Sequence, residues 1–133
     1  MEPTLYKTIE LENGQTLRIL DLSRTISEDA FVVKMKAAID IKIKPELFSN
    51  ALPSGVSLEE LTALVGDTVV YEYEMERNFI LKPLKDEVFD GLVKTFLNNL
   101  GQYVAKPNFP EKVIVKAYKD SIKQSKRLAS YTI

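Results

Sequence analysis

The sequence predicts an α+β domain. We expect an antiparallel sheet of about four strands, an N-terminal hairpin plus two long strands, with C-terminal helices packed on one face. Two observations support this class. Residues 33–44 alternate between apolar and polar side chains, as a strand with one buried face does. Residues 88–100 instead repeat their apolar side chains at helical spacing. The chain, residues 1–133, is expected to form a single domain.

A hairpin is expected at the N-terminus, with its turn at Asn13-Gly14. A two-residue turn there would place Ile9 across from Arg18. A type I turn with Gly14 as a left-handed bulge residue would instead place Ile9 across from Leu17 and gather the apolar side chains on one face. We predict the second arrangement.

The alternating segment, residues 33–44, also has a helical interpretation. Ser27 could begin a helix on which Phe31, Met35 and Ile39 share a face. The uninterrupted alternation and the abundance of Val and Ile favour a strand instead. We therefore predict the first long strand here.

The second long strand is expected over residues 68–77, with a possible continuation at Phe79-Ile80-Leu81. Three alternate positions of this strand are acidic: Glu72, Glu74 and Glu76. The polar face of the first long strand is mostly cationic: Lys34, Lys36, Lys42 and Lys44. We predict that the acidic row lies opposite the cationic row or one strand away, because opposed charges stabilise cross-strand pairs.

Three helices are expected after the first long strand. Ser57 and Glu60 form the pattern of a capping box, and Gly66 ends the short helix that follows. The stripe over residues 88–100 makes the second helix, which extends through Gly101 if the apolar pattern continues. Pro110 suits the first turn of the last helix.

Composition restricts the classes of function. The chain has no cysteine and no histidine. Disulfides and thiolate metal sites are therefore excluded, and the usual acid–base group at neutral pH is missing. We favour a non-catalytic protein over an enzyme and expect no cofactor and no metal site. The first residues do not form a signal peptide, and no apolar run approaches membrane-spanning length, so we expect a cytoplasmic protein without a membrane span.

The last helix carries the clearest charged pattern. Its lysines are spaced four, three, four and three residues apart: Lys112, Lys116, Lys119, Lys123 and Lys126. This spacing places them along one side of a helix, where they could bind the phosphates of a nucleic acid or an anionic membrane surface. The alternative is a solvated helix face, since no aromatic residue is interleaved for base stacking.

A second candidate site lies at the predicted strand ends. Its residues are Asp21, Ser23, Arg24, Glu76, Arg77 and Asn78. If Arg24 and Arg77 lie at the same end of the sheet, this group could bind a small ligand or form an enzyme site. The alternative is that Asp21 and Ser23 simply shape a turn through bonds to the backbone.

The sequence thus favours a small binding or interaction module that recognises a protein partner or a second copy of itself. Apolar area on Phe31, Phe48, Tyr71 and Tyr73 beyond what the helices cover would favour a homodimer. Two alternatives stay open. One is binding of nucleic acid or an anionic surface through the last helix, and the other is a ligand or enzyme site near Arg24 and Arg77.

Overall fold

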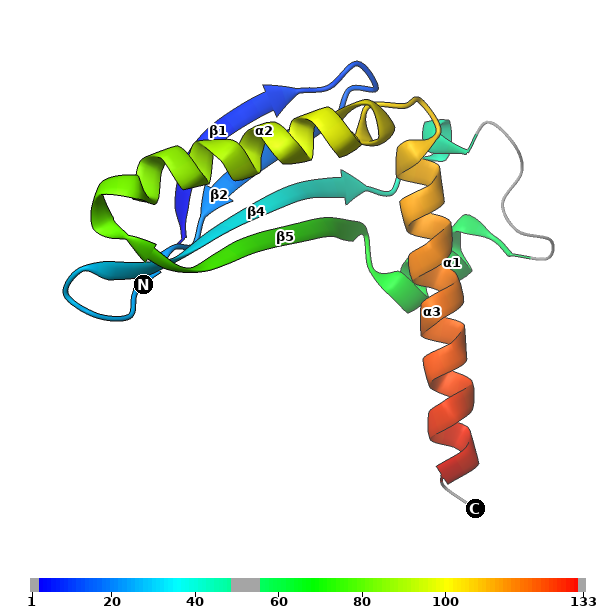
Figure 1. Cartoon of the computed structure of the whole chain (residues 1–133). Helices are drawn as coiled ribbons and strands as arrows, with labels where there is room; N and C mark the ends of the chain where they lie inside the picture. Colours follow the sequence, from blue (N-terminus) through cyan, green and yellow to red (C-terminus); the bar gives the residue numbers. More distant parts are fainter. Residues whose placement is uncertain (1–2, 49–55, 132–133) are drawn as a thin grey trace. The chain divides into compact units, whose positions relative to one another are not determined.

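The computed structural model describes residues 3–48 and 56–131, with side chains as far as Gln124 (Figure 1). This part of the chain falls into two compact units. The first unit comprises Met1–Ile39 and Tyr71–Lys106, and the second comprises Asp40–Val70 and Pro107–Ile133. The long strands β4 and β5, defined below, have residues in both units.

The predicted antiparallel sheet is confirmed and has five strands. They are β1 (Thr4–Glu10), β2 (Thr16–Asp21), β3 (Arg24–Thr25), β4 (Ala30–Lys42) and β5 (Thr68–Leu81). The strand order is β1-β2-β4-β3, and β5 also pairs with β4. β2 pairs with Met35–Ala38 of β4, and β3 pairs with Phe31 and Val32. Figure 1 shows β2 and β5 on opposite sides of β4.

The hairpin β1–β2 has the predicted register, with Ile9 opposite Leu17. Gly14 has φ +86°, the left-handed conformation that the bulge requires. The turn closes through the N–H of Gly14, which donates to the carbonyl of Leu11 at 3.0 Å. The side-chain amide of Asn13 donates to the carbonyls of Val104 and Lys106, both at 2.9 Å. The turn is therefore fastened to residues 91 and 93 positions later in the chain.

β4 is the central strand, and the helical interpretation of its sequence is wrong. Its alternate apolar side chains Val33, Met35, Ala37, Ile39 and Ile41 are all 0% exposed. Burial of every second side chain is the pattern of a strand, and a helix cannot produce it. The possible continuation of β5 is confirmed, since this strand extends to Leu81.

Helix α2 (Lys85–Val104) covers one face of the sheet in the first unit (Figure 1). It runs through Gly101, as the apolar stripe allows. Its buried side chains Phe89, Leu92, Val93 and Phe96 form the predicted inner face. The Tyr6 ring meets the Phe89 ring edge-on at 4.9 Å, and the Tyr73 ring lies 5.6 Å from the Phe96 ring.

The second unit contains helices α1 (Leu58–Val65) and α3 (Phe109–Tyr131), which contact each other. The Ser57 hydroxyl accepts the N–H of Glu60 at 3.1 Å, as a helix N-cap does. Gly66 ends α1 with φ +87°. Leu61 of α1 and Ile114 of α3 are 1% and 0% exposed, so they belong to the core of this unit.

Candidate functional site

The lysines of α3 lie around a surface hollow. The hollow has a volume of about 500 Å³ and is lined by Asn108, Glu111, Lys112, Val115, Lys116 and Lys119. Lys123 is exposed one helical turn further along, whereas the side chain of Lys126 lies outside the described residues. We call Lys112, Lys116 and Lys119 the α3 lysines. They are exposed and line the same hollow.

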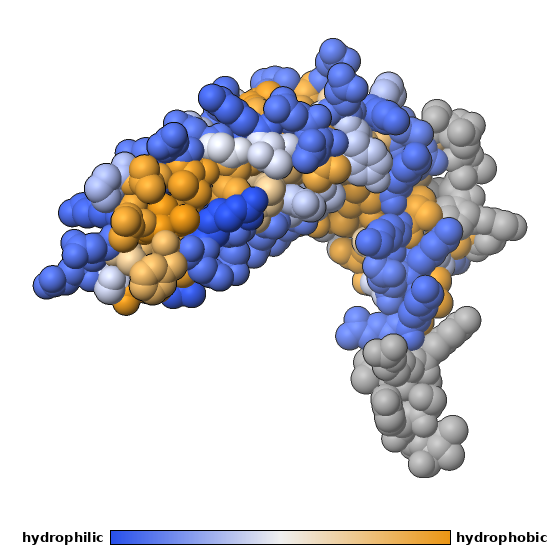
Figure 2. All heavy atoms as spheres, in the orientation of Figure 1, coloured by the Kyte–Doolittle hydropathy of each residue, from blue (hydrophilic) through white to orange (hydrophobic). Residues whose placement is uncertain are grey.

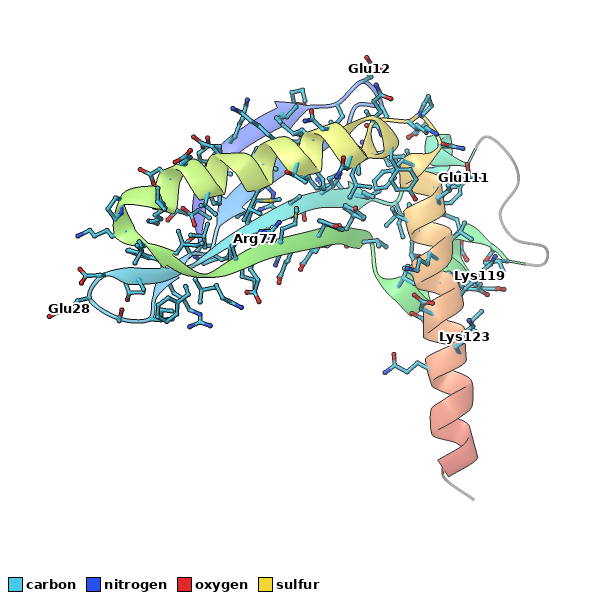
Figure 3. All side chains as sticks on the ribbon, in the orientation of Figure 1. Glu12, Glu28, Arg77, Glu111, Lys119 and Lys123 are labelled. Atoms are coloured by element: carbon cyan, nitrogen blue, oxygen red, sulfur yellow. The ribbon has the colours of Figure 1, made fainter. Side chains whose placement is uncertain are left out.

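The opposite side of α3 explains why these lysines face outward. Ile114 is 0% exposed, so its side of the helix is held in the core of the second unit. Residues three, four and seven positions apart share a helix face. Burial of the apolar face therefore presents the lysine face to solvent. Figure 3 shows Glu111, Lys119 and Lys123 along the described part of α3.

The hollow is cationic but contains one acid. Three lysines and Glu111 are the charged residues in its described lining, which leaves a net positive balance there. At about 1.5 Å of rise per residue, Lys112 and Lys119 are roughly 10 Å apart along the helix axis. One strand of a DNA duplex carries a phosphate about every 3.4 Å along its axis, so roughly three phosphates match this length.

Asp21 and Ser23 of the second candidate site have structural roles. The N–H of Ser23 donates to Oδ1 of Asp21 at 2.8 Å, and the N–H of Lys34 donates to the Ser23 hydroxyl at 3.0 Å. Ser23 is only 7% exposed. These bonds connect the bend between β2 and β3 to β4, as the turn alternative predicted for Asp21 and Ser23.

The other members of that site lie exposed near one end of the sheet. Arg24 pairs with Val32 near the start of β4. The last residues of β5 reach the same end, because the N–H of Lys82 donates to the carbonyl of Asp29 at 2.8 Å. The Arg77 guanidinium donates to the carbonyl of Glu76 at 2.9 Å. In the described part of the chain, no hydrogen bond or ion pair joins Arg24 to Arg77 or to Asn78.

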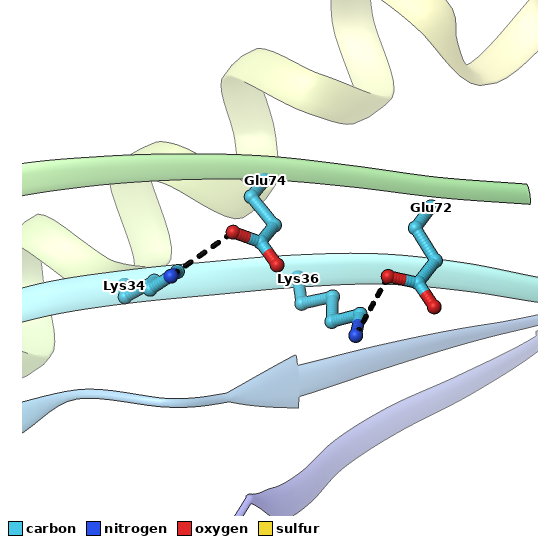
Figure 4. Close-up of polar contacts among 4 residues, drawn as sticks. All are labelled: Lys34, Lys36, Glu72 and Glu74. Atoms are coloured by element: carbon cyan, nitrogen blue, oxygen red, sulfur yellow. Dashed lines mark ion pairs between the residues drawn. The ribbon is translucent and has the colours of Figure 1, made fainter. Parts of the chain in front are cut away.

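The acidic and cationic rows meet on adjacent strands, as predicted. Lys34 of β4 lies 3.0 Å from Glu74 of β5, and Lys36 lies 2.8 Å from Glu72 (Figure 4). Residue numbers rise from Lys34 to Lys36 along β4 while those of their partners fall from Glu74 to Glu72 along β5, which is the pattern of antiparallel neighbours. These lysines are therefore engaged in the sheet, and α3 carries the better candidate for anion binding.

An exposed apolar cluster lies where β5 passes into α2. It consists of Phe79, Leu81 and Leu84, which are 73%, 53% and 47% exposed. Figure 2 shows hydrophobic residues gathered at this end of the first unit. Sequence reasoning missed the cluster, although three consecutive apolar residues, Phe79 to Leu81, signal it. A strand cannot bury three consecutive side chains on one face.

Two tyrosines in the first unit have perturbed acidity. The hydrogen bond that Tyr6 donates to Asp90 at 2.6 Å raises the pKa of Tyr6 above its ordinary value. Burial raises the pKa of Tyr71, with smaller contributions from Tyr103 and Tyr73. Neither phenol is thereby made more available as a base, because a raised pKa favours the protonated form.

Comparison of the chain with protein-family models, curated proteins and solved structures finds no match. Within residues 3–48 and 56–131, no three acidic side chains converge in a way that could hold a metal ion. None of the helices in that part has the length and apolarity needed to cross a membrane.

Proposed function

We propose that this protein is a non-catalytic binding module that binds the phosphate backbone of double-stranded nucleic acid along α3. The observation that carries the proposal is the hollow of about 500 Å³ around the α3 lysines. Lysines attract phosphate without sequence preference and release its counterions, so the binding is expected to weaken steeply with salt.

The composition of the hollow favours a duplex over the other polyanions. Among the described residues that line the hollow, Val115 alone is apolar and none is aromatic. A helix that lies on a membrane presents a broad apolar face beside its basic face. Single-stranded nucleic acid is usually held by bases stacked on aromatic side chains. A duplex requires neither feature.

The experiment is fluorescence anisotropy with a labelled DNA duplex of mixed sequence, titrated at several salt concentrations. The test variant combines Lys112→Ala, Lys116→Ala and Lys119→Ala. Its matched control combines Lys7→Ala, Lys42→Ala and Lys94→Ala, three exposed lysines on other elements with the same loss of charge. We expect the test variant to lose at least about tenfold in affinity and most of its salt dependence, since each phosphate contact contributes about 0.9 to the slope.

Two results would contradict the proposal. One is the absence of salt-dependent duplex binding by the unmodified protein at low salt. The other is an equal loss of affinity in the test and control variants, which would mean that only total charge matters. Vesicles containing anionic lipid serve as a parallel probe, and binding to vesicles but not to duplex would replace nucleic acid by a membrane surface.

We also propose that the protein acts in the cytoplasm, consistent with its lack of cysteine, and that it forms a homodimer. The observation that supports a dimer is the exposed apolar cluster, since soluble monomers rarely expose such groups together. Phe31, which the sequence suggested for this role, is instead 9% exposed and lies under the Lys85 ammonium at 5.0 Å. Sedimentation of the protein and of a Phe79→Ser/Leu81→Ser variant tests the dimer, and a monomer over the full soluble concentration range contradicts it.

A further inference from the structure

The outer edge of β5 is open in the described sheet. β5 pairs with β4 along one edge, and no other described strand pairs with it. Glu72, Tyr73 and Glu74 are all exposed along its length. An open edge presents backbone N–H and carbonyl groups, which can pair with an extended segment of another chain.

Hydrogen bonding shows which backbone groups point to the open edge. The N–H of Ile43 donates to the carbonyl of Asp67 at 2.9 Å, so Asp67 faces β4. The direction of bonding alternates from one residue to the next in an antiparallel pair. The backbone groups of Glu72 and Glu74 therefore point away from β4. The residues with acidic side chains are the ones whose amides would pair with an added strand.

The two faces of β5 determine what such a strand must carry. One face holds the carboxylates of Glu72, Glu74 and Glu76. The lysines of β4 reach Glu72 and Glu74 from the inner side, and Glu76 has no ion pair within the described residues. On the other face Tyr73 is 39% exposed beside the ring of Phe96. Tyrosine combines a large apolar ring with a polar tip and is frequent in recognition surfaces.

We propose that the open edge of β5 binds an extended peptide segment of a protein partner, with basic side chains at alternate positions and apolar side chains between them. Its backbone adds a strand to the sheet. Its basic side chains lie over the glutamate row, and its apolar side chains contact Tyr73. This site lies in the first unit and does not depend on the duplex binding proposed for α3.

A second copy of β5 is a poor occupant of the same edge. Two β5 strands paired antiparallel about Glu74 would place one glutamate row against another. Like charges directly opposite each other destabilise a cross-strand pair. The charge of the row therefore selects a basic segment and disfavours self-pairing.

The probe for this proposal is a labelled peptide of about ten residues, near the upper length of ordinary strands, that alternates lysine and valine. Its binding is measured by fluorescence anisotropy at low and moderate salt. A peptide that alternates glutamate and valine is the charge control. A lysine–valine peptide with N-methyl groups on alternate amides is the backbone control, because it keeps the charge but cannot complete the ladder.

The protein variants separate charge from backbone pairing. The charge variant combines Glu72→Gln, Glu74→Gln and Glu76→Gln. Its matched control combines Glu12→Gln, Glu28→Gln and Glu87→Gln, three exposed glutamates of the first unit. Glu74→Pro removes one outward amide at a position where an edge strand tolerates proline. Hydrogen exchange of the unmodified protein gives a second measurement if this variant does not fold.

We expect the lysine–valine peptide to bind to the unmodified protein. The two control peptides should bind at least about tenfold more weakly, which is one decade in Kd. The charge variant should lose about tenfold in its affinity for the lysine–valine peptide. Bound peptide should slow exchange of the amides of Glu72 and Glu74. The proposal fails if no binding is seen, if both glutamine variants bind the peptide equally, or if binding leaves those amides unprotected. It also fails if two copies of β5 are found paired in solution.

Discussion

The Nζ atom of Lys34 lies 3.0 Å from Oε2 of Glu74, while the backbone N–H of the same lysine donates to the hydroxyl of Ser23. Lys34 thus connects the central strand to β5 by its side chain and to the bend between β2 and β3 by its backbone. The two contacts differ in burial. The ion pair is partly exposed, at 31% and 42% of the two side chains, whereas Ser23 is 7% exposed.

The Lys34–Glu74 ion pair is expected to contribute little to stability. A double-mutant cycle with Lys34→Ala and Glu74→Ala should give a coupling free energy of about 0.2–1 kcal/mol, because solvent screens exposed charges. Urea unfolding of the four proteins at low and high salt measures it. Coupling should shrink as salt is added, and a salt-independent coupling of several kcal/mol would contradict this assignment.

Ser23→Ala should be more damaging than loss of the ion pair. The substitution removes the acceptor of the Lys34 N–H in a place where water has little access, so free energy of unfolding should fall by about 1–3 kcal/mol. Ser27→Ala is the matched control, since Ser27 is exposed, and should change stability by less than about 0.5 kcal/mol. Equal urea midpoints for the two variants would show that the buried hydroxyl is dispensable.

Phe96→Ala should destabilise the first unit strongly. The ring is 1% exposed and lies against Tyr73. Removing a buried aromatic ring costs about 3–5 kcal/mol. Chemical unfolding followed by circular dichroism checks the value. Thr95→Ala, at the exposed neighbouring position of α2, should unfold within about 0.5 kcal/mol of the unmodified protein.

Phe79 has φ +60°, and it is the one residue other than glycine with a positive φ in the described chain. A side chain in the left-handed region costs about 1–2 kcal/mol. Phe79→Gly should therefore be more stable than Phe79→Ala by roughly 1 kcal/mol, since both remove the exposed ring but only glycine relieves the backbone. Thermal and urea unfolding of the pair test this, and the opposite order of stability would rule out backbone strain at this position.

Alkaline pH should weaken the contact between Tyr6 and Asp90. Because the hydrogen bond raises the pKa of Tyr6, its stabilising effect is complete below the unfolded-state pKa of about 10 and is lost as pH rises through the higher folded-state pKa. The stability advantage of the unmodified protein over Tyr6→Phe should therefore shrink above about pH 10. Urea midpoints measured across this range give the answer, and an advantage that grew with pH would contradict it.

Tyr71→Phe provides the comparison for that experiment. Burial raises the pKa of Tyr71 by disfavouring the phenolate. A phenylalanine there has no proton to lose, so this variant should lose less stability than the unmodified protein as pH rises. Both Tyr6→Phe and Tyr71→Phe should therefore change less with alkaline pH than the unmodified protein, and a variant that lost more stability than it would contradict the raised pKa at that position.

The sequence predicted most elements that local physics determines. The register of the hairpin followed from the apolar pattern around Gly14, and the strand β4 followed from alternation that a helix could not bury. Ser57 and Gly66 marked the ends of α1 by their capping chemistry. In each case a local pattern or a single residue has a strong preference for the observed conformation.

The unpredicted features depend on contacts between distant parts of the chain. β3 has only two residues, and it exists because Asp21 and Ser23 hold a bend against β4. The left-handed Phe79 has no sequence signal, since phenylalanine disfavours that conformation. The row of lysines on α3 was predicted, but the sequence pattern did not indicate that Asn108 and Val115 line the same hollow.

The side-chain amide of Asn13 links the C-terminal end of α2 to the turn of the hairpin. Its two bonds satisfy the carbonyl of Val104, the last residue of α2, which the helix leaves open, and that of Lys106, two residues further on. These partners lie far apart in the sequence, so the contact forms only after a large loop has closed. During folding, the last turn of α2 should therefore acquire its full protection from hydrogen exchange late, together with the Asn13–Gly14 turn.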